Sequence, residues 1–159
     1  MPLNAPISQR GRLDLILVSP RPKATLVQPD AVDAIAGLGL EGDHRSRGKP
    51  GRRRQVTLLQ AEHLTALGML LGRGPVDPVD LRRNLVISGF PIAALGRRRL
   101  LIGAVVLELT GPCDPCARVE SALGPGAEAA AVGLAGWTAR VICGGALRVG
   151  ATVTLAAAP

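Results

Sequence analysis

The longest strand pattern in the chain is Leu100-Leu101-Ile102-Gly103-Ala104-Val105-Val106-Leu107-Glu108-Leu109-Thr110. Aliphatic and β-branched residues dominate it, which favours a buried strand, and Gly103 predicts a bulge or bend inside that strand. The stretch leads directly into residues 111–120, which contain two of the three cysteines. We therefore expect the chemistry of this protein at the end of this strand.

Most of the remaining pattern also predicts strands, over 12–18, 54–59, 138–143 and 147–155, with a short β-rich run before Gly89. Gly144-Gly145 is a hairpin signal, and Gly150 predicts a bend. Helical spacing is limited to 60–71 and a short segment at 116–123. Regular alternation of strands and helices is missing, which argues against a dinucleotide-binding fold. We expect a mostly β fold with minor α, a closed or partly closed barrel, as a single domain over residues 1–159 with its core at about 12–155.

Composition narrows the classes of partner. The chain has 159 residues, of which 47% are hydrophobic, and its only aromatic residues of the Phe, Trp and Tyr type are Phe90 and Trp137. Few aromatics disfavour modules that stack nucleic-acid bases. The formal net charge is +7, and every basic residue except Lys23 and Lys49 is an arginine. Arginine recognises phosphate and carboxylate groups, although a coding bias would also enrich it on the surface.

The cysteine count and the hydropathy pattern indicate a compartment. Three cysteines are an odd number, and residues 1–6 lack the basic and apolar regions of a signal peptide. No apolar stretch reaches the ~18 residues of a membrane span. We expect a cytoplasmic protein with free thiols and no membrane partner.

Cys113-x-x-Cys116 has several interpretations. A redox dithiol is expected in a βαβ context, which the pattern lacks. A structural zinc site needs a second pair of ligands, and Cys143, His44 and His63 do not form one. One thiolate beside Arg118 could instead act as a nucleophile or as a soft ligand for a transition metal. Buried cysteines without any chemical role are the remaining alternative.

The run from Arg45 to Arg54 is basic, rich in glycine and free of acids. Such a run fits a phosphate-binding loop, a nucleic-acid patch or a solvated loop. Arg82, Arg83 and Asn84 would add a second anion-binding element if the fold brings them near. His44 is either a ligand or hydrogen-bond donor of the site or an ordinary loop histidine.

An ordered set of short motifs resembles the MOSC domain, the C-terminal domain of molybdenum cofactor sulfurase. The domain also occurs in stand-alone bacterial proteins and in the mitochondrial amidoxime-reducing component. The resemblance covers roughly residues 12–155. The motifs are Gly42-Asp43-His44 before a basic loop, Arg54-Gln55-Val56-Thr57-Leu58-Leu59, Arg82-x-Asn84-Leu85-Val86-Ile87-Ser88-Gly89, Gly103 before Glu108-Leu109-Thr110-Gly111, Pro115-Cys116, Gly136-x-x-Ala139-Arg140-Val141 and Gly145-x-x-Arg148-Val149-Gly150.

The resemblance implies a β-barrel that binds the molybdenum cofactor, a pterin with a phosphate and a dithiolene-bound metal. Cys116 matches the family cysteine that ligates molybdenum or is proposed to carry sulfur, so it is the predicted catalytic residue and metal ligand. Cys113 lies where the family varies. The family is also associated with pyridoxal phosphate. Predicted cofactor-binding residues are His44, Arg53, Arg54, Arg82, Asn84 and Arg118.

Two departures from the family pattern bear on these implications. The family has Arg-His after Gly-Asp, whereas this chain has His44 and then Arg45. We also expect none of the extra domains of some family enzymes, so a reductase would need electrons from a partner protein, and a sulfur carrier would need a sulfur donor. The possible reaction is sulfur transfer or the reduction of N-hydroxylated compounds. Rival hypotheses are a polyanion or nucleic-acid binder, with nucleic acid disfavoured, and a Cys113–Cys116 thiol redox protein.

Overall fold

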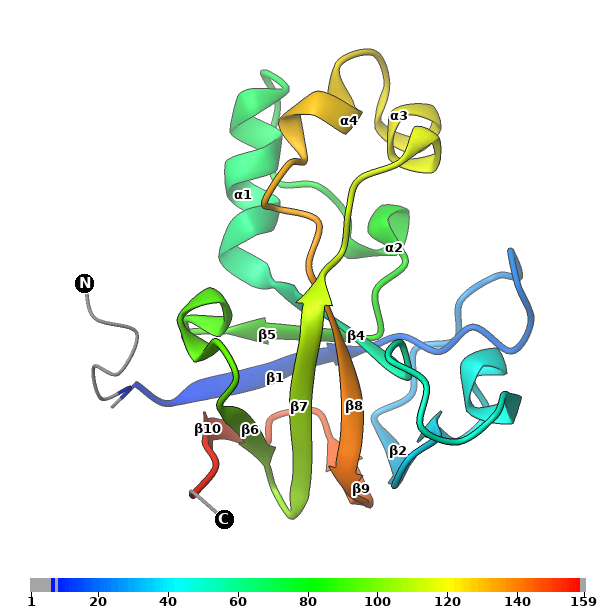
Figure 1. The fold of residues 1–159 in the computed structure, drawn as a ribbon. Coiled ribbons are helices and arrows are strands. Elements are labelled where there is room, and N and C mark those ends of the chain that lie inside the picture. Colours follow the sequence, from blue (N-terminus) through cyan, green and yellow to red (C-terminus); the bar gives the residue numbers. More distant parts are fainter. Residues whose placement is uncertain (1–6, 8, 158–159) are drawn as a thin grey trace.

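The computed structural model describes residue 7 and residues 9–157, and in this part of the chain seven strands close into a barrel (Figure 1). Around the barrel the order is β1 (Gly11–Ile16), β10 (Thr152–Leu155), β6 (Arg99–Ile102), β7 (Val105–Pro112), β8 (Trp137–Cys143), β4 (Val56–Gln60) and β5 (Leu85–Ser88). A small second sheet has the order β3 (Gly39–Leu40), β2 (Ala31–Ile35) and β9 (Gly145–Arg148). The predicted mostly β barrel is confirmed and is closed.

Four short helices gather at one end of the barrel and form what we call the helical layer (Figure 1). They are α1 (Ala61–Leu70), α2 (Pro78–Leu81), α3 (Ala117–Leu123) and α4 (Ala127–Ala130). Two 3₁₀ turns, η1 (His44–Arg47) and η2 (Ile92–Leu95), lie in loops. α1 and α2 connect β4 to β5, which pair in parallel, because parallel neighbours need a long crossover connection. Among the described residues no helix has the length and apolar content to cross a bilayer.

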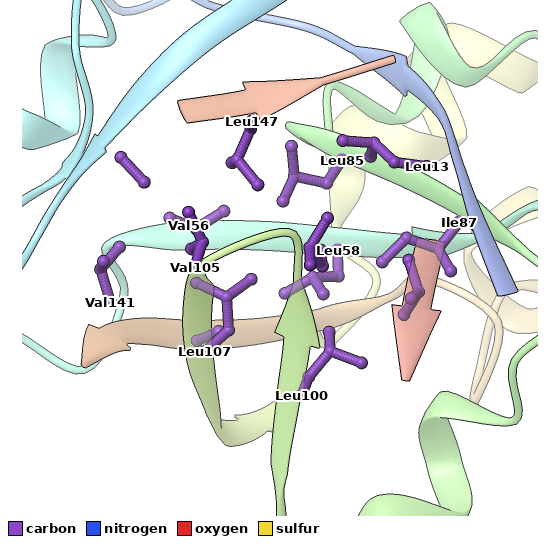
Figure 2. Close-up of a cluster of buried hydrophobic side chains, with 14 of the residues drawn as sticks. Leu13, Val56, Leu58, Leu85, Ile87, Leu100, Val105, Leu107, Val141 and Leu147 are labelled. Atoms are coloured by element: carbon purple, nitrogen blue, oxygen red, sulfur yellow. The ribbon is translucent and has the colours of Figure 1, made fainter. Parts of the chain in front are cut away.

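The barrel interior is filled by aliphatic side chains, as Figure 2 shows. Leu13, Leu58, Leu85, Ile87 and Leu107 have no exposed surface. A second buried cluster lies between the barrel and the helical layer, where Leu59 and Val86 meet residues of the helices such as Leu67 and Val119. β4 and β5 are therefore covered on both faces, and all their residues except Gln60 and Ser88 are buried.

The structure corrects two predictions about glycines. Residues 100–110 are not one bent strand, because Gly103, with φ +59°, forms the turn of a hairpin in which Ile102 pairs with Val105. Gly144-Gly145 is not a hairpin turn. β9 leaves β8 and pairs with β2, and a Cβ at Gly144 would lie 2.6 Å from the Ala34 carbonyl oxygen, so the absence of a side chain permits close passage of two backbones.

Other predictions from the pattern are confirmed, namely strands near 12–18, 54–59 and 138–143, and helices near 60–71 and 116–123. Gly150, with φ +93°, lies between β9 and β10 as expected. The sequence did not predict β2, β3, α2 or α4. β2 and β3 flank turns in a segment whose prolines and glycines indicated only a loop.

Candidate functional site

A buried carboxylate, Asp43, organises the loops on one side of the barrel. It has no exposed surface. Its Oδ2 accepts from the backbone N–H of Ser19 at 2.9 Å and its Oδ1 from that of Arg45 at 3.1 Å. The side-chain amide of Asn84 also donates to Oδ2, at 3.1 Å. Because a buried charge must be compensated by hydrogen bonds, these contacts fix the three loops relative to one another.

Asn84 extends this network into the barrel wall. Its amide nitrogen also donates to the Leu17 carbonyl at 2.9 Å, and its amide oxygen accepts from the backbone and hydroxyl of Thr57 at 3.0 and 3.1 Å. Asn84 is 2% exposed, and both polar ends of its side chain are engaged by the protein. In this structure Asn84 therefore supports the site from below, and its direct contact with a cofactor stays a prediction.

Above this network lies a small pocket of about 90 Å³, which we call the basic pocket. Its wall contains four cationic side chains and one imidazole and no carboxylate, and the full lining is Ser19, Pro22, Lys23, His44, Arg45, Arg82 and Arg118. These residues come from segments that are distant in the sequence. Three predicted residues, His44, Arg82 and Arg118, thus converge, while Lys23 was not predicted.

Arg82 is held in place by the loop at residues 19–24. Its backbone is left-handed, with φ +54°, at the end of α2. Its guanidinium donates to the Ser19 hydroxyl at 3.1 Å and to the Ala24 carbonyl at 2.6 Å. His44 Nδ1 lies 3.0 Å from the Ser19 carbonyl, which can only accept, so Nδ1 carries the proton and Nε2 is left as an acceptor in the neutral ring. Both predicted residues are therefore orientated by the same loop.

Beside the basic pocket, further arginines and the two neighbouring cysteines influence one another electrostatically. Burial lowers the pKa of Arg45, and the charge of Arg54 lowers it further, whereas Asp43 opposes the shift. Burial also lowers the pKa of Arg83, an effect opposed first by Cys113 and less by Cys116. A lowered arginine pKa still leaves the group cationic near neutral pH. The cluster therefore concentrates positive charge where an anion would compensate it.

Arg83, which the sequence placed with Arg82 and Asn84 in a possible second anion-binding element, is an electrostatic neighbour of Cys113 and Cys116. It is 9% exposed, and its guanidinium donates to the carbonyls of Ala135 and Leu81 at 2.7 and 2.9 Å. These bonds hold a fixed cation next to the cysteine loop. The only sequence signal for it was its position between Arg82 and Asn84, which does not distinguish inward from outward side chains.

The two cysteines of the motif have different environments. Cys113 is 7% exposed, and its backbone N–H donates to the Gly136 carbonyl at 2.8 Å. A Cβ at Gly136 would lie 2.2 Å from the Leu58 carbonyl oxygen, so only glycine fits there. Cys116 is exposed and immediately precedes α3. It stands two residues before Arg118, so their Cα atoms are at most about 7 Å apart.

Arg53 and Arg54, predicted together, lie in different surroundings. Arg54 is an electrostatic neighbour of Arg45 and Arg83. Arg53 donates to the Thr110 carbonyl at 2.7 Å and lines a separate pocket on β7 and β8.

Cys143, the third cysteine, is exposed at the end of β8. Among the described residues no group of three His, Cys, Asp or Glu side chains could hold a metal ion, which gives a structural zinc site no support.

A family model described as MOSC domain matches residues 43–154. This chain belongs to the MOSC domain family. The match begins at the buried Asp43 and includes the Arg82 motif, the cysteine loop and β8. The MOSC family is associated with binding of the molybdenum cofactor. No curated protein matches the chain at a significant level.

Solved structures with the same fold include the YuaD protein from Bacillus subtilis, with a TM-score of 0.77 and 20% identity, covering 92% of this chain and 96% of that one. YiiM from Geobacillus stearothermophilus has a TM-score of 0.66 and 19% identity, covering 92% of this MOSC chain and 75% of its own. YiiM from Escherichia coli has a TM-score of 0.64 and 18% identity, and the match covers 93% of this chain and 71% of the YiiM chain. At these identities the likeness concerns the fold alone.

Proposed function

We propose that this MOSC protein binds the molybdenum cofactor between the basic pocket and the cysteine loop, with Cys116 as the thiolate ligand of molybdenum or the carrier of a sulfur atom. The observation that carries the proposal is the convergence of His44, Arg82 and Arg118 on one pocket, with Arg118 two residues after Cys116. Residues distant in the sequence thus supply an anion-binding wall beside an exposed thiol.

The donor set fits the chemistry of the cofactor. A phosphate carries negative charge and accepts several hydrogen bonds, and guanidinium groups supply charge and donors in a matching geometry. The pocket wall has no carboxylate to repel a phosphate. Asp43 lies beneath the wall, but it is buried and already accepts three N–H groups. Thiolate sulfur is the protein ligand that soft metals prefer.

Each residue of the site has a distinct part in this proposal. Arg82, Arg118 and Arg45 bind the phosphate, and the nearby Arg54 adds positive charge. In the proposal Asn84 has an indirect part, through the loop that carries Arg82, and Arg53 has no contact with the cofactor, because Arg53 lines a separate pocket. Arg83 is a positioning residue whose fixed charge stabilises negative sulfur in the cysteine loop. Cys116, unlike Cys113, is open to a large ligand.

The molybdenum cofactor supplies a metal that exchanges electrons and oxygen or sulfur atoms. If the protein is a reductase, an N-hydroxylated compound gains two electrons and two protons and releases water, and a partner electron-donor protein of the cytoplasm supplies the electrons. If it is a sulfur carrier, the Cys116 thiolate takes the outer, sulfane sulfur from a persulfide of a donor protein, so that Cys116 becomes the persulfide and the donor leaves as its thiolate. Both reactions use the same exposed thiol.

The proposal is tested by producing the protein in a host that makes the cofactor and measuring molybdenum by elemental analysis and pterin by fluorescence. We expect both in the parent protein, and at least tenfold less molybdenum in Cys116→Ala with an unchanged unfolding midpoint. Arg118→Ala should lose pterin, since a hydrogen bond to a charged group contributes about 1.5–3 kcal/mol. Equal molybdenum and pterin in Cys116→Ala and the parent would refute the ligand role.

Cys143→Ala is the matched control, because Cys143 is also an exposed cysteine but lies at the end of β8. It should retain the parent's cofactor content. The cofactor content of Cys113→Ala, compared with that of Cys116→Ala, distinguishes the roles of the two thiols of the motif. A reversible Cys113–Cys116 disulfide without any molybdenum would favour the redox alternative. Salt-sensitive nucleic-acid binding without molybdenum would favour the polyanion binder.

Pyridoxal phosphate remains a prediction that rests on the family. Lys23 and the arginines of the basic pocket are the groups that would meet its aldehyde and its phosphate. Its test is the absorbance change on adding pyridoxal phosphate to the parent and to Lys23→Ala. An unchanged spectrum in the parent would remove this function.

A further inference from the structure

A second concave region lies on the outer face of β7 and β8, and we call it the outer groove. It consists of two adjoining pockets of about 280 and 340 Å³ that share Arg97, Leu109 and Thr110. None of the residues that line it lines the basic pocket. β7 and β8 run side by side along the front of the barrel in Figure 1. The outer groove is therefore separate from the site proposed for the cofactor.

One end of the outer groove is cationic. Arg53, Arg97 and Arg140 reach it from the loop before β4, the loop before β6 and β8. Arg53 uses one nitrogen to donate to the Thr110 carbonyl, and Arg140 uses Nε to donate to the Arg52 carbonyl at 3.3 Å. Each therefore keeps further donors. For Arg97, the described part of the chain shows no acceptor bound to its guanidinium.

The only carboxylate that lines this end, within the described residues, is Glu108. It is paired with Arg99 at 2.9 Å, on the neighbouring strand β6. Its charge is thus balanced by a residue outside the groove lining, and the three arginines of the groove have no carboxylate of their own. A site of this composition favours an anion.

The other end of the outer groove is apolar and contains Ala93, Leu109, Pro112 and Trp137. Trp137 is half-buried and packs on the His63 ring, with 5.7 Å between the ring centroids. Packing against another ring limits the indole's freedom, so a flat ligand can lie against it at a small entropic cost. Gly111 lines the same region, and a Cβ there would lie 3.3 Å from the Arg53 guanidinium.

We propose that the outer groove binds small organic anions in which a planar apolar body carries a carboxylate or phosphate group. The three arginines bind the anionic group, and Trp137 and Leu109 contact the apolar body. The volumes of the two pockets suit a ligand of this size rather than a macromolecular surface. The inference does not depend on the molybdenum cofactor, since the groove shares no lining residue with the basic pocket.

The test uses the full chain without cofactor and the probes 2-naphthoate, its neutral analogue 2-naphthalenemethanol, and inorganic phosphate. Trp137 is the only tryptophan, so the single indole N–H signal in a nitrogen–proton NMR spectrum reports the apolar end directly. We expect 2-naphthoate to shift this signal in a saturable manner, with an affinity at least tenfold higher than that of 2-naphthalenemethanol. Phosphate should compete with 2-naphthoate.

Arg97→Ala should weaken 2-naphthoate binding about tenfold or more, because it removes one of the three cations of the groove. The side chain is exposed, and no hydrogen bond or ion pair of its guanidinium within the described residues is lost. Arg73→Ala, another exposed arginine but in the loop after α1, is the matched control and should bind as the parent does. Equal shifts by both naphthalene probes, or unchanged affinity in Arg97→Ala, would overturn the proposal. Binding of an acidic peptide without any effect of 2-naphthoate would also overturn it and indicate a protein partner.

The result is independent of the proposed function. Arg118→Ala should reduce cofactor content and leave 2-naphthoate binding unchanged. Arg97→Ala should weaken 2-naphthoate binding and leave cofactor content unchanged. If Arg118→Ala abolished the response to 2-naphthoate as well, the two regions would be one site and the inference would be wrong.

Discussion

The basic pocket and the outer groove both gather arginines, but the protein supports them differently. Under the basic pocket lies a buried network in which Asp43 and Asn84 tie three loops to the barrel wall. In the outer groove, the arginines stand on the outside of the barrel, and Arg53 and Arg140 are each held by one side-chain hydrogen bond to a backbone carbonyl. We therefore expect changes beneath the pocket to affect stability and binding together, and changes in the groove to affect binding alone.

The largest expected effect follows from replacing Asp43. Asp43→Ala leaves the Ser19 and Arg45 N–H groups and one donor of Asn84 without their acceptor, and each unsatisfied buried group costs about 1–3 kcal/mol. We expect a loss of about 3 kcal/mol or more in the free energy of unfolding, measured by urea denaturation, together with a loss of cofactor. Asp43→Asn keeps one acceptor oxygen and should lose less. A change below about 1 kcal/mol in Asp43→Ala would mean that the network does not support the pocket.

This network also shows how far the sequence could predict the site. The sequence predicted Cys116, His44, Arg82 and Arg118. His44, Arg82 and Arg118 line one pocket, and Cys116 stands two residues before Arg118. The motifs did not show that Asn84 is buried with both polar ends occupied, because a motif records which residues recur and not which way they point. Lys23 was missed for a related reason. Its loop joins the pocket only through long-range contacts such as that of Arg82 with Ala24.

The fold, too, was predictable from the sequence only in part. Alternating and apolar runs predicted the barrel because strand burial is encoded in local periodicity. The role of glycines was not predictable, since Gly103 makes a turn, Gly144 permits a close backbone passage, and both look alike in sequence. β2 escaped prediction because its partners β3 and β9 make it a strand, while its own residues are mostly exposed.

pH is expected to have a smaller effect on stability, through His63, which packs on Trp137 of the outer groove. Burial lowers the pKa of His63 below its ordinary value of 6.5, and the neighbouring Glu62 opposes the shift only in part. His63 Nδ1 is buried, and no residue in the described part of the chain forms a hydrogen bond with it. As pH falls below about 6.5 the unfolded chain takes up a proton that the folded protein does not, so stability is lost between 6.5 and the lower native pKa.

We expect this loss to be smaller than that in Asp43→Ala, because His63 is only half-buried. It is measured by urea denaturation at a series of pH values and by the NMR titration of the His63 ring, with the Trp137 indole signal changing at the same midpoint. His63→Gln should flatten the pH dependence in this range. A native pKa at or above 6.5 would contradict the prediction.

The smallest expected effect on stability concerns the ion pair between Arg99 and Glu108. Their side chains are 35% and 30% exposed, so Arg99→Gln should cost less than about 1 kcal/mol in urea denaturation. The same change frees Glu108 to pair with the groove arginines, and 2-naphthoate affinity should fall a few-fold. Glu108→Gln removes that competitor and should raise the affinity instead. If both variants shifted the affinity in the same direction, the pair would not control the charge of the groove, and the contrast between a supported pocket and an open groove would need another physical basis.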